Sequence, residues 1–184
     1  EVLDPTRKLA RVTFDGAAGR RVGSLDRVRL DRIWDLMCSA LAHEMIGGAQ
    51  YLLDSTVEYT KVRYQFGRPI GSFQALKHRC ADLLMEIEIA RAHTHHAARC
   101  LDAAGTAGEA AGESEPFAAS MAKAAAADAY MSAARAGIQL RGGIGFTWEN
   151  DTHLWFKRAK ASEVFLGTPA RHRERMMALL EASA

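Results

Sequence analysis

Two glycine-containing segments carry the groups that could hold an anionic cofactor. Segment 63–71 begins with Arg63 and includes Phe66, and segment 139–146 begins with Gln139. An arginine guanidinium suits a pyrophosphate because it donates two parallel N–H bonds. Glycines leave backbone N–H groups open to a phosphate or to the edge of a flavin. An aromatic ring and an amide suit an adenine or flavin edge, so both segments are candidate nucleotide-binding segments.

The glycine-rich run 141–148 does not fit the dinucleotide fingerprint of parallel-sheet proteins. That fingerprint follows a strand and opens a helix, whereas here a helical pattern precedes a Gly-Gly-x-Gly spacing. One interpretation is a helix C-cap in which glycines adopt positive φ. The other is an open backbone surface that contacts phosphate or flavin.

Histidines and a basic run offer weaker candidates. His93 and His96 share a helical face, but no third ligand follows at a suitable spacing, so we expect no metal site. The basic run 171–175 is expected on the solvent-facing side of an amphipathic helix. Neither feature indicates a site by itself.

Composition excludes several classes of protein. The chain has 184 residues, a net charge of +2 and 48% hydrophobic residues, which excludes extensive disorder. Charges of both signs are mixed, which argues against a nucleic-acid binder. No apolar run approaches the roughly 18 residues of a membrane span. Cys38, Cys80 and Cys100 form no CxxC pair, so we expect reduced thiols and a cytoplasmic location.

The first part of the chain differs from the rest. Residues 9–16 alternate between apolar and polar side chains and end in Asp-Gly, which predicts one β-strand and a turn. A lone strand needs partners, so it would pair in an oligomer or belong to a sheet outside this chain. We therefore expect residues 1–23 to be the end of a β-domain with its linker, and residues 24–184 to form a second domain.

The second domain shows helical spacing throughout. Ser24 is the expected N-cap of the first helix, and Gly47 and Gly48 within that helix are expected where a neighbouring helix approaches closely. Thr168 and Pro169 are a natural N-cap and first helical residue. The predicted helices are 25–61, 72–104, 117–140, 151–161 and 170–181. The fold class is therefore all-α, an antiparallel up-down helical bundle with a short N-terminal β-segment.

Two runs carry a family resemblance. Residues 59–74 read YTKVRYQFGRPIGSFQ and resemble the flavin-contacting segment of acyl-CoA dehydrogenases, and residues 138–149, IQLRGGIGFTWE, resemble their second flavin-contacting loop. The resemblance covers the whole chain. Residues 9–15 look like the last strand of the family's middle β-domain, and everything after Ser24 looks like its C-terminal helical-bundle domain, of the bacterial type.

The resemblance implies a function and its site residues. Enzymes of this family remove hydrogens from Cα and Cβ of an acyl-CoA; a carboxylate takes the α-proton, FAD takes the β-hydride, and electrons pass to an electron-transfer flavoprotein. Arg63 matches the arginine that contacts the FAD pyrophosphate of a neighbouring subunit. The other positions implied to contact FAD are Phe66, Gln74, Gln139, Gly142, Gly143 and Thr168.

This sequence departs from the family at the catalytic base. Leu166 stands where most members carry a glutamate before Gly-Thr, and Met37 stands at the alternative position on the first helix. Neither side chain accepts a proton. Glu44 lies about two turns beyond Met37 and is the candidate base. Ala170 replaces a flavin-contacting glutamine of the family.

The leading hypothesis is therefore the C-terminal domain of an FAD-dependent acyl-CoA dehydrogenase that acts as a homotetramer. The alternative is a catalytically silent subunit of an α2β2 heterotetramer whose paralogous partner supplies the glutamate. Under both hypotheses the 184-residue chain by itself is expected to bind FAD poorly and to turn over no acyl-CoA.

Overall fold

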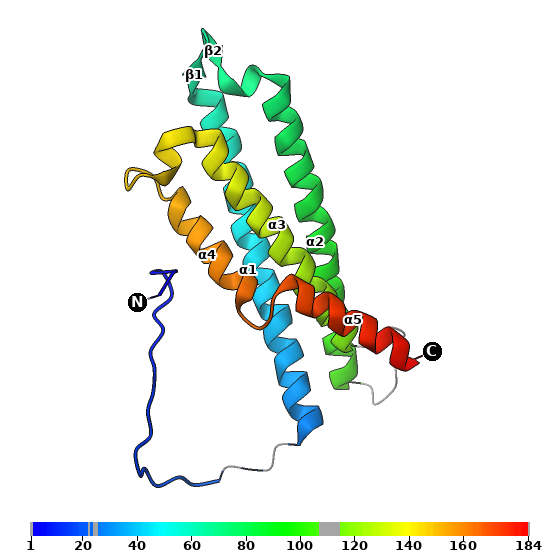
Figure 1. The fold of residues 1–184 in the computed structure, drawn as a ribbon. Helices are drawn as coiled ribbons and strands as arrows, with labels where there is room; N and C mark the ends of the chain where they lie inside the picture. Colours follow the sequence, from blue (N-terminus) through cyan, green and yellow to red (C-terminus); the bar gives the residue numbers. More distant parts are fainter. Residues whose placement is uncertain (1, 22, 24–25, 107–114, 184) are drawn as a thin grey trace.

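The computed structural model describes residues 2–21, 23, 26–106 and 115–183, which form a helical bundle (Figure 1). The predicted all-α class is confirmed, and the predicted helices agree with the observed ones within a few residues. The helices are α1 (Arg27–Val62), α2 (Gln74–Thr106), α3 (Glu115–Arg141), α4 (Thr152–Val164) and α5 (Pro169–Ser183). Short elements connect them: strands β1 (Tyr64–Gln65) and β2 (Arg68–Pro69) and 3₁₀-helices η1 (Ile70–Ser72) and η2 (Gly142–Phe146).

Helix α3 occupies the centre of this arrangement. It packs against α1, α2, α4 and α5, while α1 and α2 also pack against each other. The chain runs up α1, down α2 and up α3, so the C-terminal ends of α1 and α3 lie at the same end of the bundle (Figure 1). α5 crosses α3 near the opposite end.

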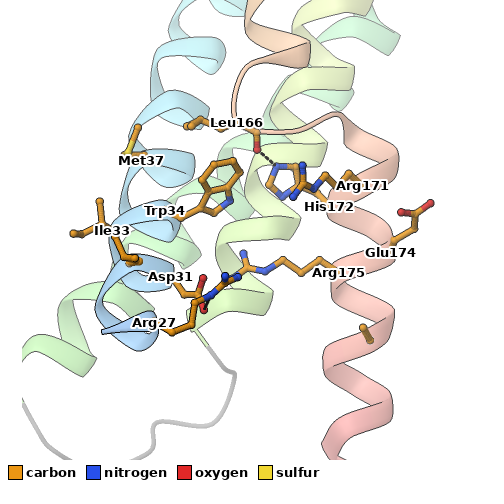
Figure 2. A pocket seen from close by; sticks show the side chains of 12 residues that line it. Arg27, Asp31, Ile33, Trp34, Met37, Leu166, Arg171, His172, Glu174 and Arg175 are labelled. Atoms are coloured by element: carbon orange, nitrogen blue, oxygen red, sulfur yellow. Dashed lines mark hydrogen bonds and ion pairs between the residues drawn. The ribbon is translucent and has the colours of Figure 1, made fainter. Parts of the chain in front are cut away.

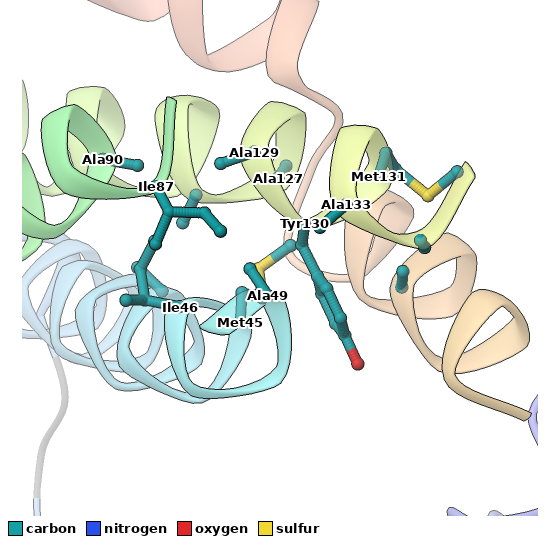
Figure 3. Close-up of a cluster of buried hydrophobic side chains, with 14 of the residues drawn as sticks. Met45, Ile46, Ala49, Ile87, Ala90, Ala127, Ala129, Tyr130, Met131 and Ala133 are labelled. Carbon is teal, nitrogen blue, oxygen red and sulfur yellow. The ribbon is translucent and has the colours of Figure 1, made fainter. Parts of the chain in front are cut away.

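Alanine lets these helices approach closely. Many alanines of α3 are fully buried, and larger side chains of α1 and α2, including Met45, Ile46 and Ile87, pack against them (Figure 3). Alanine has the highest helix propensity and loses no side-chain entropy on burial. α3 therefore combines helical stability with a thin profile at the centre of the core.

The glycine pair of α1 has one position that needs glycine. A Cβ at Gly48 would lie 2.6–2.8 Å from ring atoms of Tyr130, whereas a Cβ at Gly47 would meet nothing within 4 Å. Tyr130 belongs to α3 and is 2% exposed. The predicted close approach of a neighbouring helix is thus confirmed for Gly48 and wrong for Gly47, which faces solvent.

Two local predictions need correction. α1 begins after Asp26, whose side chain accepts a 2.8 Å hydrogen bond from the Arg29 amide; Ser24, the expected cap, lies outside the described residues. Segment 63–71, expected to be a loop, contains a small antiparallel hairpin in which β1 pairs with β2. A two-residue turn with positive φ joins the strands, and this geometry matches the right-handed twist of a hairpin.

The predicted strand at residues 9–16 is not formed. This segment has no strand assignment because no partner strand lies beside it in the described part of the chain. Its apolar side chains Leu9, Val12 and Phe14 are 69–80% exposed. The boundary between domains 1–23 and 24–184 stays a prediction.

The sequence predictions also concern the cysteines and the helices of the described chain. Cys38, Cys80 and Cys100 are free thiols, and Cys38 is buried. Within the residues that the structure describes, no helix is both long and apolar enough to cross a membrane.

The contact between Gly48 and Tyr130 leads to a stability prediction. Gly48→Ala should lower the free energy of unfolding by about 1–2 kcal/mol, because overpacking costs more than the gain in helix propensity. Gly47→Ala is the matched control and should raise it by up to ~1 kcal/mol. Denaturant unfolding followed by circular dichroism measures both. Equal effects of the two substitutions would contradict the assigned contact.

Candidate functional site

The two candidate nucleotide-binding segments meet in one pocket. Arg63 and Phe66 line it from the hairpin, and Gln139, Gly142 and Gly143 line it from the end of α3. The pocket has a volume of about 710 Å³. It forms because α1 and α3 end at the same end of the bundle, so the segments that follow them become neighbours (Figure 1). We call it the hairpin pocket; Gln74, the first residue of α2, follows Phe73 of its wall but is not itself in the lining.

The hairpin presents an aromatic ring to solvent. Phe66 has φ 54° and is 90% exposed, and Gly67 after it has φ 77°. A positive φ is costly for a bulky residue, and such strain is concentrated at binding sites. The Phe66 ring meets Phe73 edge to face at a centroid distance of 6.1 Å. Phe66 is therefore held outward at the rim of the pocket.

The glycines after α3 have different roles. Gly142 has φ 66° and ends the helix, as the C-cap interpretation predicts. A Cβ at Gly142 or Gly143 would meet nothing within 4 Å, so their backbone is open to the pocket. Gly145 is required for packing, because its Cβ would lie 3.0 Å from the Ile138 carbonyl oxygen. The glycine backbone is thus sterically accessible in the pocket that Arg63 also lines, which fits contact with a dinucleotide.

Met37 and Leu166 line a second pocket. It has a volume of about 750 Å³ and lies between the first half of α1, the α4–α5 loop and α5 (Figure 2). Trp34 and His172 also line it. The two positions at which the family resemblance would place the catalytic glutamate therefore line one cavity, here called the Leu166 pocket. Both positions carry apolar side chains.

The loop that carries Leu166 is held through its backbone. Leu166 has φ 60° and Gly167 has φ 105°. Lys123 of α3 is fully buried and donates from Nζ to the carbonyls of Glu163 (3.3 Å) and Gly167 (3.2 Å). The Leu166 carbonyl lies 3.0 Å from His172 Nε2 and can only accept, so Nε2 carries the proton (Figure 2).

Burial shifts the protonation of both anchoring residues. Desolvation lowers the pKa of Lys123 to about 8. Desolvation likewise lowers the pKa of His172 to about 4, with the cations Lys123, Arg175 and Arg171 adding to the shift. His172 is thus neutral at physiological pH, and sequence spacing did not indicate either residue. Lys123 stands among alanines, and His172 belongs to the basic run 171–175 that was expected to face solvent; for His172 that expectation is wrong, since it is buried.

The carboxylates that line the Leu166 pocket do not replace a base. Asp31 forms a 3.0 Å ion pair with Arg27. Glu174 is exposed on α5, and its side chain points away from Met37 and Leu166 (Figure 2). No other carboxylate lines this pocket among the described residues.

Thr168 lies just beyond this loop. Its Oγ1 accepts from the Arg171 amide at 3.4 Å and caps α5, as predicted. It follows the loop of the Leu166 pocket and is absent from the lining of the hairpin pocket. The structure thus does not bring Thr168 together with Arg63.

Glu44 lies in a third place. It lines a smaller pocket together with Tyr130 and forms ion pairs with Arg7 and with Arg158, the latter at 2.7 Å. Burial would raise the pKa of Glu44, but the hydrogen bonds and charges of Arg7 and Arg158 outweigh it and hold the pKa below its usual value. The structure does not bring Glu44 together with Met37 or Leu166.

Comparison with known proteins shows the family of this chain. Residues 36–180 match the family model described as "Acyl-CoA dehydrogenase, C-terminal domain". The chain belongs to the acyl-CoA dehydrogenase family. FAD is the cofactor that membership of this family implies.

The chain is similar to a curated acyl-CoA dehydrogenase and to several solved structures. The chain is 44% identical to acyl-CoA dehydrogenase IpdE2 of Mycobacterium tuberculosis over 91% of its own length and 46% of that protein. It resembles the structure of the Tcur3481–Tcur3483 steroid ACAD (31% identity, TM-score 0.76, 85% of this chain and 41% of that one). It also resembles the ChsE4–ChsE5 complex of M. tuberculosis (27% identity, TM-score 0.70, 84% and 39%). The chain thus spans less than half the length of these acyl-CoA dehydrogenases.

The neutral His172 makes the stability of this acyl-CoA dehydrogenase domain pH-dependent. Its folded pKa, about 4, lies below the value of 6.5 for a free histidine, so its stabilisation is complete above pH 6.5 and lost as pH falls toward 4. Between pH 7 and pH 5 we expect a loss of about 2 kcal/mol in the free energy of unfolding.

Denaturant titrations at these two pH values measure that loss. His172→Gln should abolish most of the difference, while His78→Gln, at an exposed position of α2, should leave it in place. An unchanged pH dependence in His172→Gln would show that another group is responsible.

Proposed function

We propose that this chain is the C-terminal domain of an FAD-dependent acyl-CoA dehydrogenase and that its hairpin pocket binds FAD. One observation carries the proposal: Arg63 and Phe66 share a pocket with Gln139 and Gly143, although the two segments lie far apart in the sequence. FAD, when bound, supplies the acceptor for the hydride that leaves Cβ of the acyl-CoA. The electrons then pass to an electron-transfer flavoprotein.

Each residue of the pocket has a chemical role in this proposal. Arg63 binds the pyrophosphate, because its guanidinium donates two N–H groups in one plane. Phe66, on the strained hairpin turn, packs against the adenine, and Gln74 at the start of α2 lies on the same adenosine side. Gln139 offers a side-chain amide. Gly142 and Gly143 bind through their open backbone.

A complete flavin site takes residues from two subunits in this proposal. Thr168 contacts the phosphates of the flavin bound to its own subunit. It lies at the N-terminus of α5, where backbone amides bind anions. Arg63 and Gln139 contact the flavin bound to a neighbouring subunit. The separation of Thr168 from the hairpin pocket within one chain supports this division. It requires an oligomer, either a homotetramer or an α2β2 heterotetramer.

The composition of the Leu166 pocket favours the heteromeric form. Met37 and Leu166 face that pocket at both usual base positions, and the pocket's carboxylates are paired or turned away. Abstraction of the α-proton needs a group that accepts it. We therefore propose a subunit that is catalytically silent and whose partner carries the glutamate. The two related structures named for pairs of subunits support this form.

Glu44 is a weak alternative as the base. It is fixed by two arginines, and its lowered pKa makes it a poorer proton acceptor. It also lines a different pocket from Leu166. Its contacts favour a role in fastening the N-terminal segment to α1 and α4. The cytoplasmic location and the inactivity of the isolated 184-residue chain remain predictions.

The proposed pyrophosphate contact predicts a loss of flavin. In the full-length protein, Arg63→Ala should weaken FAD binding about tenfold, because a charge-assisted bidentate contact is lost. Lys61→Ala is the matched control: it removes one positive charge two residues away, where Lys61 pairs with exposed Glu58. Equilibrium dialysis of FAD measures both. Equal retention of flavin in the two variants would count against the proposed site.

The silent-subunit form predicts a dependence on a second subunit. The full-length protein purified alone should not oxidise acyl-CoA, and activity should appear on co-expression with a paralogous dehydrogenase subunit that carries the glutamate. In that assembly Glu44→Gln should leave turnover unchanged and cost less than ~1 kcal/mol of stability, since the carboxylate is 47% exposed.

The opposite result would identify the base. If the protein alone is active and Glu44→Gln abolishes turnover while yellow flavin stays bound, Glu44 is the catalytic residue and the silent-subunit proposal is wrong.

A further inference from the structure

Arg141 is a buried cation without a carboxylate partner among the described residues. It ends α3 and is 9% exposed. Its Nη1 donates to the Thr56 hydroxyl (2.7 Å) and the Gly137 carbonyl (3.1 Å), and its Nη2 donates to the Ser55 hydroxyl (3.0 Å). Its Nε is buried and has no hydrogen-bond partner. All these partners are neutral.

The other arginines in comparable positions have counter-charges. Arg175 donates to both carboxylate oxygens of the buried Asp35. Arg158 forms ion pairs with Asp4 and Glu44. Arg141 differs from both, because the acceptors around it orient the guanidinium without neutralising it.

An unneutralised buried charge is unfavourable. Taking a cation out of water costs several kcal/mol unless an opposite charge replaces the water. Desolvation lowers the pKa of Arg141 for this reason. The ring of Tyr59, 5.4 Å away, and the negative end of the α3 dipole offset only part of the cost. An anion bound nearby would therefore stabilise the Arg141 charge.

The position of Arg141 shows where the anion would bind. Arg141 lines the hairpin pocket together with Gly142 and Arg63. No aspartate or glutamate is in the lining of this pocket. Two arginines and a sterically accessible glycine backbone thus line one cavity of about 710 Å³. That charge pattern suits a ligand with two adjacent negative charges.

We propose that Arg141 is the buried counter-charge for the diphosphate of a dinucleotide bound in the hairpin pocket. Arg141 acts as a positioning residue: its charge acts on the diphosphate through the poorly screened pocket wall, while Arg63 makes the exposed contact. This inference rests on the proposed function, and it adds a residue that selects ligands by their charge. FAD and coenzyme A both carry an adenosine diphosphate group, and we assign the site to FAD.

The test compares ligands that differ only in the diphosphate. The full-length protein, in its natural assembly and freed of flavin, is titrated with ADP and with adenosine by isothermal calorimetry. The wild type should bind ADP at least about tenfold more tightly than adenosine. Arg141→Gln should weaken ADP binding about tenfold and adenosine binding less than about twofold. Competition with FAD and with coenzyme A then identifies which ligand displaces ADP.

Two further variants separate charge from packing. Arg135→Gln removes the same charge from an exposed position of the same helix and should change neither affinity. Arg141→Lys keeps the charge and should keep most of the preference for ADP. If Arg141→Gln does not fold, the Arg141→Lys variant and the salt dependence of wild-type ADP binding test the inference instead. Loss of the preference for ADP over adenosine in Arg141→Lys overturns the inference.

The remaining outcomes are distinct. Equal weakening of ADP and adenosine by Arg141→Gln, or no weakening of either, overturns the inference and leaves FAD binding by the wild type untouched. A wild type that prefers ADP but is not competed by FAD refutes the proposed function and leaves Arg141 as a diphosphate counter-charge. If coenzyme A displaces ADP and FAD does not, the site binds coenzyme A and its assignment to FAD is overturned. A wild type that binds neither ADP nor FAD overturns both.

Discussion

The close approach of helices around α3 is the constraint on which the rest of the structure depends. Buried alanines along α3 let α1, α2, α4 and α5 all reach the same helix. The same helix then supplies the buried polar groups at both pockets: Lys123 reaches the loop at Leu166, and Arg141 reaches the hairpin pocket. A bulkier α3 would separate the elements that these two side chains join.

The two pockets differ in charge. Among the described residues, the hairpin pocket is lined by the cations Arg63 and Arg141 and by no carboxylate, whereas the Leu166 pocket has charges of both signs beside an apolar wall of Trp34, Met37 and Leu166. In the first, the residue types suit phosphate binding. In the second, the two positions at which the family resemblance places a catalytic glutamate carry apolar side chains. Both features support the proposed silent subunit.

The sequence predicted the helices and singled out the two candidate nucleotide-binding segments, because helical spacing and glycine-rich runs are local signals; that these segments share a pocket appeared only in the structure. It failed where the outcome depends on partners. The strand at residues 9–16 needs a neighbouring strand that the described chain lacks. Gly47 and Gly48 look alike in sequence, and only the position of Tyr130 separates them. Lys123, Arg141 and His172 were missed because burial of a polar side chain appears only once the helices are packed.

The anchoring of the α4–α5 loop has an evolutionary consequence. Lys123 and His172 hold this loop by the carbonyls of residues 163, 166 and 167, so they bind its main chain and not its side chains. These anchoring hydrogen bonds therefore do not depend on the chemical type of the side chain at position 166. An exchange between glutamate and leucine at this position leaves the anchoring bonds intact, so a lineage can lose or regain the reactive group without first rebuilding the fold.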